Sequence, residues 1–293
     1  MGRSRMDILH YAEIALAAFI AGTIDTVVGF GGGLLLLPIL VLMVGTLDAV
    51  LLTALIPLGW NIPRILLLRN WIDWNKTMWF TLGILPGALF GGQLLGHLDA
   101  ATVRVGIGCV MVLFGGYYIL RLYVDLPKER LPGLWPLPVV GLLTGAVSAW
   151  VGAGNGPLQT WALDASGLNA HQAAATNGAL GGITAVARCI AYGIAGELHS
   201  GLIPTAVVGT AGAVAGALLG VRYARRTKDS TLELVVGLAI VLAGIRMFFS
   251  FGGAAHPTPA PPAPVAAVSH QLQDSAAAGW GISLACSNLR SGW

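Results

Sequence analysis

Apolar runs of membrane-spanning length follow one another along most of the chain, separated by short polar or glycine-rich breaks. A helix needs about 20 apolar residues to cross a bilayer. On that scale the first part of the chain divides into runs at 8–28, 34–46, 47–69, 76–96 and 102–123. After a polar connector, DLPKERLPG at 125–133, further runs follow at 135–151, 157–167, 170–193, 200–221 and 231–250. This pattern predicts an all-α polytopic membrane protein.

Two of these runs, 34–46 and 157–167, are too short to cross the membrane alone, since a helix rises about 1.5 Å per residue and the hydrocarbon core is about 30 Å thick. Each follows a glycine cluster, GFGGG from Gly29 and GAGNG from Gly152, and the two clusters are 123 residues apart. Each half of the chain is therefore expected to contain a glycine-broken helix.

The same register holds for other residues, which predicts two repeated halves. Thr53 and Thr176 are also 123 residues apart, and Arg64 and Arg188 are 124 apart. Because each half has five segments, an odd number, the second half is expected to be inverted relative to the first. Such repeats are typical of secondary transporters that work by alternating access.

Domain boundaries follow from this repeat. The expected parts are a first transmembrane repeat at 1–124, a connector at 125–134, a second repeat at 135–250, and a Pro/Ala-rich tail at 251–293 that we expect to be disordered and dispensable. With the N-terminus outside, the basic loops RNWIDWNK, RLYVDLPKER and RYARRTK all lie inside, as the positive-inside rule requires. Counting each broken run as one crossing instead gives eight crossings and parallel halves.

Composition supports a multi-pass protein of the cell inner (plasma) membrane. The 293 residues are 56% hydrophobic and 10% charged, with a mean hydropathy of +0.77, whereas soluble domains carry about 25% charged residues. The net charge of +3 is spread between apolar runs, so no nucleic-acid partner is expected. Asp7 and Glu13 interrupt the first run and no A-x-A site follows it, so we expect no cleaved signal peptide.

No metal, cofactor or catalytic motif is found. The three cysteines lack CxxC spacing, the six histidines lack metal-ligand spacing, and no GxSxG, HExxH or Walker sequence occurs. GFGGGL is not a dinucleotide fingerprint, because Leu34 stands where the third glycine is required. A transporter is therefore favoured, with a membrane-embedded enzyme or an accessory membrane protein without transport activity as alternatives.

The glycine breaks are the candidate substrate site. Backbone amides freed by a break must be buried in protein or line a watery cavity, and the N-terminus of the following half-helix attracts anions. The alternative is that these glycines only permit close packing, as expected for the runs at 87–96 and 209–220. A leucine at Gly32 is expected to stop transport without stopping insertion. The candidate substrate-binding residues are Gly31, Gly32, Gly33, Thr53, Gly154, Asn155, Gly156, Thr176 and Asn177.

Three charged residues lie near the breaks. Arg64 and Arg188 would suit an oxyanion, but Arg64 lies near a helix end, so we expect both side chains to snorkel to the headgroups. Asp25 either carries a coupling proton or pairs with an arginine.

Several motifs resemble the sulfite exporter TauE/SafE family of membrane permeases. They are the glycine cluster with its apolar run, GFGGGLLLLPIL, the small-Thr-small elements LTA at 52–54 and ATN at 175–177, and the loop NWIDW. The resemblance covers about residues 10–250. It implies transport of sulfite, sulfonates or related small anions, and leaves a coupling proton or cation open. The second half departs from the pattern, with Asn155 in place of a glycine, Pro157 directly after the break, and Trp161 where the first half has Pro38.

Overall fold

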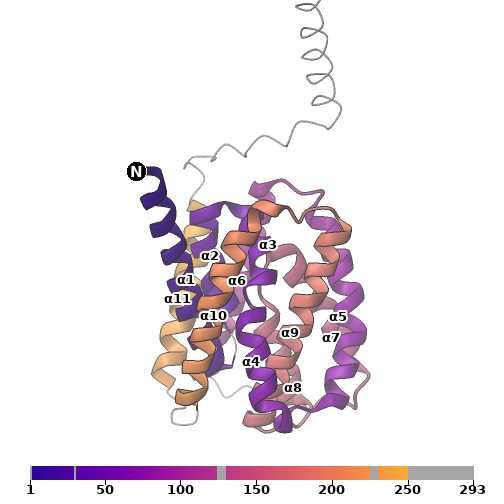
Figure 1. Ribbon diagram of the computed structural model, residues 1–293. Coiled ribbons are helices and arrows are strands. Elements are labelled where there is room, and N and C mark those ends of the chain that lie inside the picture. The colour runs from indigo at the N-terminus through magenta and orange to yellow at the C-terminus, as the bar shows by residue number, and fades with distance from the viewer. Residues whose placement is uncertain (1, 30, 124–129, 225–229, 250–293) are drawn as a thin grey trace, which may run out of the picture. The chain divides into compact units, whose positions relative to one another are not determined.

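The fold is built from α-helices (Figure 1). The computed structural model describes residues 2–29, 31–123, 130–224 and 230–249, and no strand occurs within these ranges. The helices are α1 (Gly2–Val28), α2 (Gly32–Val44), α3 (Thr46–Leu55), α4 (Leu58–Leu68), α5 (Trp74–Leu95), α6 (Ala100–Tyr123), α7 (Pro136–Val151), α8 (Asn155–Ala165), α9 (Ala170–Ile194), α10 (Ile203–Ala224) and α11 (Ser230–Phe249), with 3-10 turns η1 (Arg69–Trp71) and η2 (Ser200–Leu202). The predicted all-α fold class is confirmed.

Several helices have the length and composition of membrane spans. Five such spans are found among the described residues, at Leu9–Val28, Thr46–Trp71, Trp74–Leu95, Ala100–Tyr117 and Ser200–Tyr223. Shorter apolar helices are Gly32–Val44, Pro136–Val151 and Leu234–Met247. The predicted run 47–69 is divided into α3 and α4 at Ile56 and Pro57. Proline lacks the N–H that a continuous helix would use, so it is tolerated at the start of α4.

Both glycine breaks adopt the same backbone geometry. Gly29 and Gly31 have φ angles of 100° and 99°, and Gly152 and Gly154 have φ angles of 93° and 102°. This left-handed region is open to glycine and strained for residues with a Cβ atom. The short helices α2 and α8 begin directly after these breaks, with 13 and 11 residues. The predicted pair of glycine-broken helices is therefore present, in the register of 123 residues.

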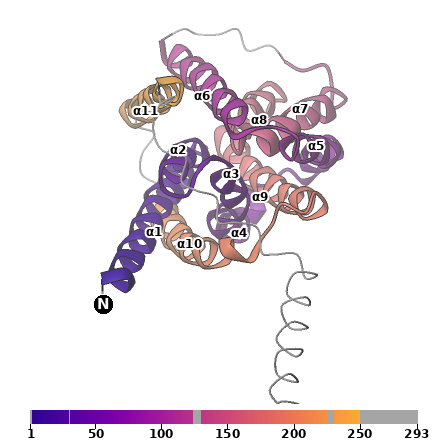
Figure 2. The same ribbon diagram turned by 90° about the horizontal axis from the view of Figure 1, so that it is seen from above.

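Helices of one half pack against helices of the other (Figure 2). The helix α1 packs along α10, and α7 packs along α5. Small residues permit close contact at both interfaces: Gly212 lies against Ala15 and Gly216 against Phe19. The residue numbers rise together on the two helices, so α1 and α10 run in the same direction. The contacts between α5 and α7 follow the same order, so these two helices are also parallel. The runs at 87–96 and 209–220 are packing surfaces, as expected.

Chain direction differs between the halves. The helix α9 runs antiparallel to α4, because Gly178 contacts Arg64 while Gly181, one turn later, contacts Asn61. The ends of α4 and α10 and the starts of α5 and α11 lie at the lower end in Figure 1. Each main helix of the first half thus runs opposite to its counterpart in the second. These directions are the ones expected for inverted halves. The sequence repeat itself remains a prediction.

Candidate functional site

A cavity of about 60 Å³ lies between the two glycine breaks. One water needs at least about 10–15 Å³ by this measure, so the cavity has room for about four to six groups of that size. Its lining residues come from both halves of the chain. They are Asp25, Gly31, Gly33, Leu34, Thr53, Pro57, Trp60, Asn61, Arg64, Gly152, Ala153, Gly154, Asn155, Gly156, Pro157, Asn177, Gly181, Thr184, Ala185 and Arg188.

Most of the candidate residues from the sequence line this cavity. The candidate ligands that do so are Gly31, Gly33, Thr53, Gly154, Asn155, Gly156 and Asn177, together with the charged residues Asp25, Arg64 and Arg188. Gly32 and Thr176 are not among the lining residues. The fold therefore brings together positions that are more than 100 residues apart in the sequence.

Gly32 faces helix α1 instead of the cavity. Its amide donates a hydrogen bond to Asp25 Oδ1 at 3.0 Å. A Cβ atom at Gly32 would lie 2.5 Å from the carbonyl oxygen of Ala21 and 2.6 Å from Asp25 Cβ. A leucine there would press α2 away from α1, so our expectation of an inserted but inactive protein is not supported by this geometry.

Gly33 offers the cleaner test of the cavity. The nearest atom to a Cβ at Gly33 is Ala153 Cβ at 4.0 Å, so Gly33→Ala should fold normally and reduce flux by occupying cavity space. Gly32→Ala should instead destabilise the protein by about 1–3 kcal/mol through overpacking. Thermal unfolding of the purified variants and labelled-sulfite flux in proteoliposomes measure the two effects. Wild-type flux in Gly33→Ala, or wild-type stability in Gly32→Ala, would contradict this assignment.

Thr176 holds a loop. Its hydroxyl oxygen accepts a hydrogen bond from the backbone N–H of Asp73 at 3.0 Å. The Asp73 side chain caps α5 by accepting from the Lys76 backbone N–H at 3.0 Å and pairs with Lys76 Nζ at 2.6 Å. Partial burial acts to raise the pKa of Asp73, but the hydrogen bonds and charge of Lys76 outweigh it and hold the pKa below its usual value. Thr176 therefore helps to fix the turn between α4 and α5.

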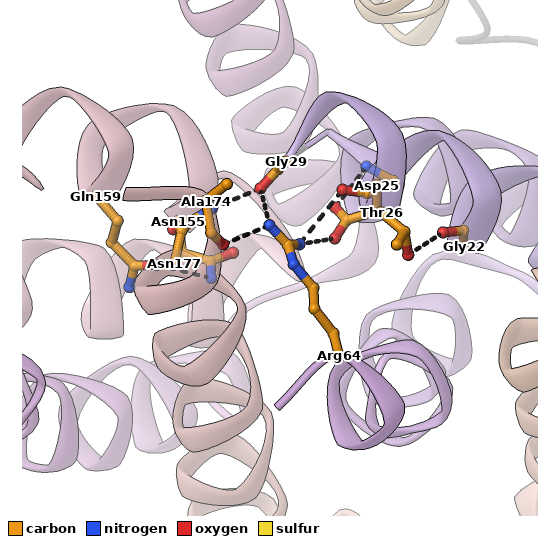
Figure 3. A network of polar contacts seen from close by, with 10 residues as sticks. Gly22, Asp25, Thr26, Gly29, Arg64, Asn155, Gln159, Ala174 and Asn177 are labelled. Atoms are coloured by element: carbon orange, nitrogen blue, oxygen red, sulfur yellow. Dashed lines mark hydrogen bonds and ion pairs between the residues drawn. The ribbon is translucent and has the colours of Figure 1, made fainter. Parts of the chain in front are cut away.

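Arg64 is buried beside the first break, with only 2% of its surface exposed. Its guanidinium pairs with Asp25 Oδ2 at 3.0 Å and donates to the carbonyl oxygens of Asp25 at 3.3 Å, Gly29 at 3.0 Å and Ala174 at 2.6 Å (Figure 3). Asn177 Nδ2 also donates to Gly29 O, at 2.8 Å. The expectation of a snorkelling Arg64 is wrong, because the carboxylate and the carbonyls freed by the break offer partners inside the protein. Of the two roles expected for Asp25, pairing with an arginine is confirmed.

Arg188 is also buried, with 4% of its surface exposed, so snorkelling is wrong for this residue too. Its guanidinium donates to Thr53 O at 3.0 Å, Val50 O at 2.8 Å and Thr53 Oγ1 at 2.9 Å. Its Nε donates to the Tyr192 hydroxyl at 3.2 Å, which donates to Ala149 O at 2.6 Å. All of these partners are neutral. Among the described residues, no carboxylate lies within ion-pair distance of Arg188.

The two breaks therefore differ in charge. At the first break, the Asp25 carboxylate neutralises Arg64 and occupies the first amide of α2. At the second break, the position 123 residues after Asp25 is Ser148, which cannot supply a charge. The start of α8 follows Gly154 in a left-handed conformation with no side-chain cap. The second break thus combines an uncompensated cation with the positive end of a helix dipole.

Sequence reasoning missed Trp60, Asn61 and Thr184, which also line the cavity. Asn61 and Thr184 are 123 residues apart, so the repeat register could have identified them as a pair. Thr184 belongs to a weak chain of contacts with Gln159 at 3.5 Å, and Gln159 accepts from Asn155 Nδ2 at 3.4 Å. Within the described residues, no group of three His, Cys, Asp or Glu side chains could hold a metal ion.

A multi-helix membrane protein with two broken helices around a central polar cavity has the architecture of a membrane transporter. The chain belongs to the sulfite exporter TauE/SafE family, whose family model matches residues 14–262. It is 26% identical over 262 residues to a "Probable membrane transporter protein" of Haemophilus influenzae (strain ATCC 51907 / DSM 11121 / KW20 / Rd), covering 80% of this chain and 95% of that protein. No solved structure matches the chain significantly. The predicted tail, 251–293, lies outside the described residues, although the family match reaches into it.

These findings establish a coarse function. The protein is a multi-pass membrane transporter that takes a small-molecule substrate. Family membership agrees with the expectation that it is not an enzyme.

Proposed function

We propose that the protein is a secondary transporter that moves a small anion, sulfite or an organosulfonate, across the cytoplasmic membrane by alternating access. The observation that carries this proposal is the uncompensated charge of Arg188 in the cavity wall. A buried charge without a counter-ion is unfavourable. A bound anion would supply the missing charge, and the open N-terminus of α8 would add backbone donors.

Arg64 has a different role in this proposal. Both arginines donate to protein oxygens through their terminal nitrogens, but only Arg64 has its charge balanced, by Asp25. It therefore ties α1 and α4 to α9, while Arg188 faces the transported anion. If Asp25 carries a coupling proton, its ion pair with Arg64 must open during transport. The alternative is that a cation drives transport.

Alternating access is supported by the arrangement of the halves. Both halves contribute a glycine-broken helix to one cavity, and their helices run in opposite directions. In transporters with inverted repeats, one half moves against the other around such a central site.

The test of the proposal is flux into proteoliposomes that contain the purified protein. Isotope-labelled sulfite, thiosulfate and small sulfonates should enter faster than into protein-free liposomes, and unlabelled anion should compete. Absence of flux for every anion, in a protein that is folded and correctly inserted, would leave an accessory membrane protein as the better account.

The orientation in the membrane gives a separate prediction. Single cysteines at Asn75 and Tyr223, in a background without native cysteines, should react with a membrane-impermeant reagent from the same face. Cysteines at Asp99 and Ser200 should react from the opposite face. We expect the first pair to be cytoplasmic, because basic residues such as Lys76 and Arg222 lie at that end. Labelling of Asn75 and Tyr223 from opposite faces would contradict inverted halves.

A further inference from the structure

Asn61 is a cavity-lining side chain whose hydrogen-bonding capacity is wholly unused by the protein. It is buried, with 4% of its surface exposed, and lines the cavity. Its side-chain amide makes no hydrogen bond to any described residue, whereas Thr53, Asn155 and Arg188 have partners in the protein. Asn177 donates to Gly29 O through Nδ2, while its Oδ1 is buried without a partner. Buried amides are nearly always hydrogen-bonded, because leaving one unpaired is unfavourable. The Asn61 amide is open to the cavity, so water or a bound ligand there can form its hydrogen bonds.

Asn61 lies between the two arginines along α9. Gly178 contacts Arg64, and Gly181, one turn further along, contacts Asn61. Arg188 is roughly two turns beyond Gly181, given a rise of about 1.5 Å per residue. Side chains slope toward the N-terminus of their own helix, and α4 and α9 are antiparallel, so the Asn61 and Arg188 side chains slope toward each other. Both can contact one ligand in the same cavity.

The charge of the cavity wall limits the charge of that ligand. Among the described residues that line the cavity, Asp25 and Arg64 neutralise each other, and Arg188 has no counter-ion. A single negative charge balances the wall. A second one would be buried without a partner, which is strongly unfavourable.

We infer, on the basis of the proposed function, that the cavity selects a singly charged oxyanion that still carries a proton. Its charged oxygens lie at Arg188 and the start of α8, and its hydroxyl donates to the Asn61 side-chain oxygen. The cavity, with a volume of about 60 Å³, has room for several water-sized groups and therefore suits a small anion. Asn61 is then a specificity residue, because a site that pairs with a hydroxyl rejects an analogue without one.

A matched pair of small anions tests this inference. Hydrogencarbonate and nitrate have the same charge and number of non-hydrogen atoms, but only hydrogencarbonate carries a hydroxyl. Competition with labelled-sulfite flux, and protection of the purified protein against thermal unfolding, measure binding in two independent ways. We expect hydrogencarbonate to act at roughly tenfold lower concentration than nitrate, and the dianion sulfate to act weakly in both assays.

Asn61→Leu should remove the preference for hydrogencarbonate without lowering stability, since Asn61 has no partner in the protein to lose. Thr176→Val is the matched control, because it removes the hydrogen bond to Asp73 outside the cavity and should lower stability while keeping the preference. Equal action of nitrate and hydrogencarbonate on the wild type, or an unchanged preference in Asn61→Leu, would overturn the inference and leave the anion transporter intact. If no anion binds or moves, the proposed function fails, and the inference fails with it.

Discussion

Arg188→Gln is expected to abolish anion flux while the protein still folds. Glutamine Nε2 takes the position of Arg188 Nε, so it retains a donor for the Tyr192 hydroxyl, but it removes the charge that the anion requires. Removing one partner of a buried, hydrogen-bonded charge pair costs about 2–5 kcal/mol, which corresponds to a roughly 30- to 5,000-fold loss in apparent affinity. Labelled-sulfite flux and ligand-dependent thermal stabilisation of the purified variant measure this loss.

Tyr192→Phe is the matched control for Arg188. It keeps the charge of Arg188 but removes the hydroxyl that contacts Arg188 Nε and Ala149 O. A neutral hydrogen bond contributes about 0.5–1.5 kcal/mol, so we expect a modest loss of affinity. Flux within about threefold of the wild type in Arg188→Gln, a change of less than about 0.7 kcal/mol, would show that Arg188 does not face the substrate.

Asp25→Leu is expected to destabilise the protein strongly, because it leaves the Arg64 guanidinium buried without a counter-ion. Breaking a buried pair in this way costs about 3–5 kcal/mol. Replacing both partners, with Asp25→Leu and Arg64→Met together, should cost less than the sum of the single changes, since no charge remains buried. Thermal unfolding of the single and double variants measures the coupling, and additive losses would argue against the ion pair.

Arg64→Lys distinguishes the pair from a snorkelling side chain. A snorkelling arginine tolerates lysine. Here the guanidinium engages Asp25, Gly29 O and Ala174 O at once, and an ammonium group cannot reproduce that planar geometry. The variant is therefore expected to fold less stably than the wild type.

Local sequence patterns were sufficient to predict the helices and the two glycine breaks. Apolar runs set the segment boundaries within a few residues, because each helix in lipid must satisfy its own backbone. The glycine clusters identified both interruptions, since few other residues accept the φ angles found at Gly29, Gly31, Gly152 and Gly154. One boundary was missed: the division at Ile56 and Pro57 lies inside a continuously apolar run.

Which side chain faces which neighbour required the tertiary structure. Gly32 and Gly33 are adjacent in sequence, yet one packs on α1 and the other lines the cavity, because successive helix positions point in different directions. Arg64 and Arg188 were assigned to the headgroups from their distance to a helix end. That distance does not show whether a carboxylate or a free carbonyl lies opposite, and here both arginines find such partners inside the protein.

The sequence by itself determined the membrane class, the helices, the two glycine breaks and the family resemblance, because these depend on hydrophobicity and backbone freedom along the chain. The tertiary structure alone decided the charge balance of the cavity. Asp25 and Arg64 are 39 residues apart and form a pair, while Arg188 keeps its charge because Ser148 stands at the position that corresponds to Asp25. The sequence shows the serine, but the pairing itself appears only when α1 and α4, which are distant in the chain, are brought together in space.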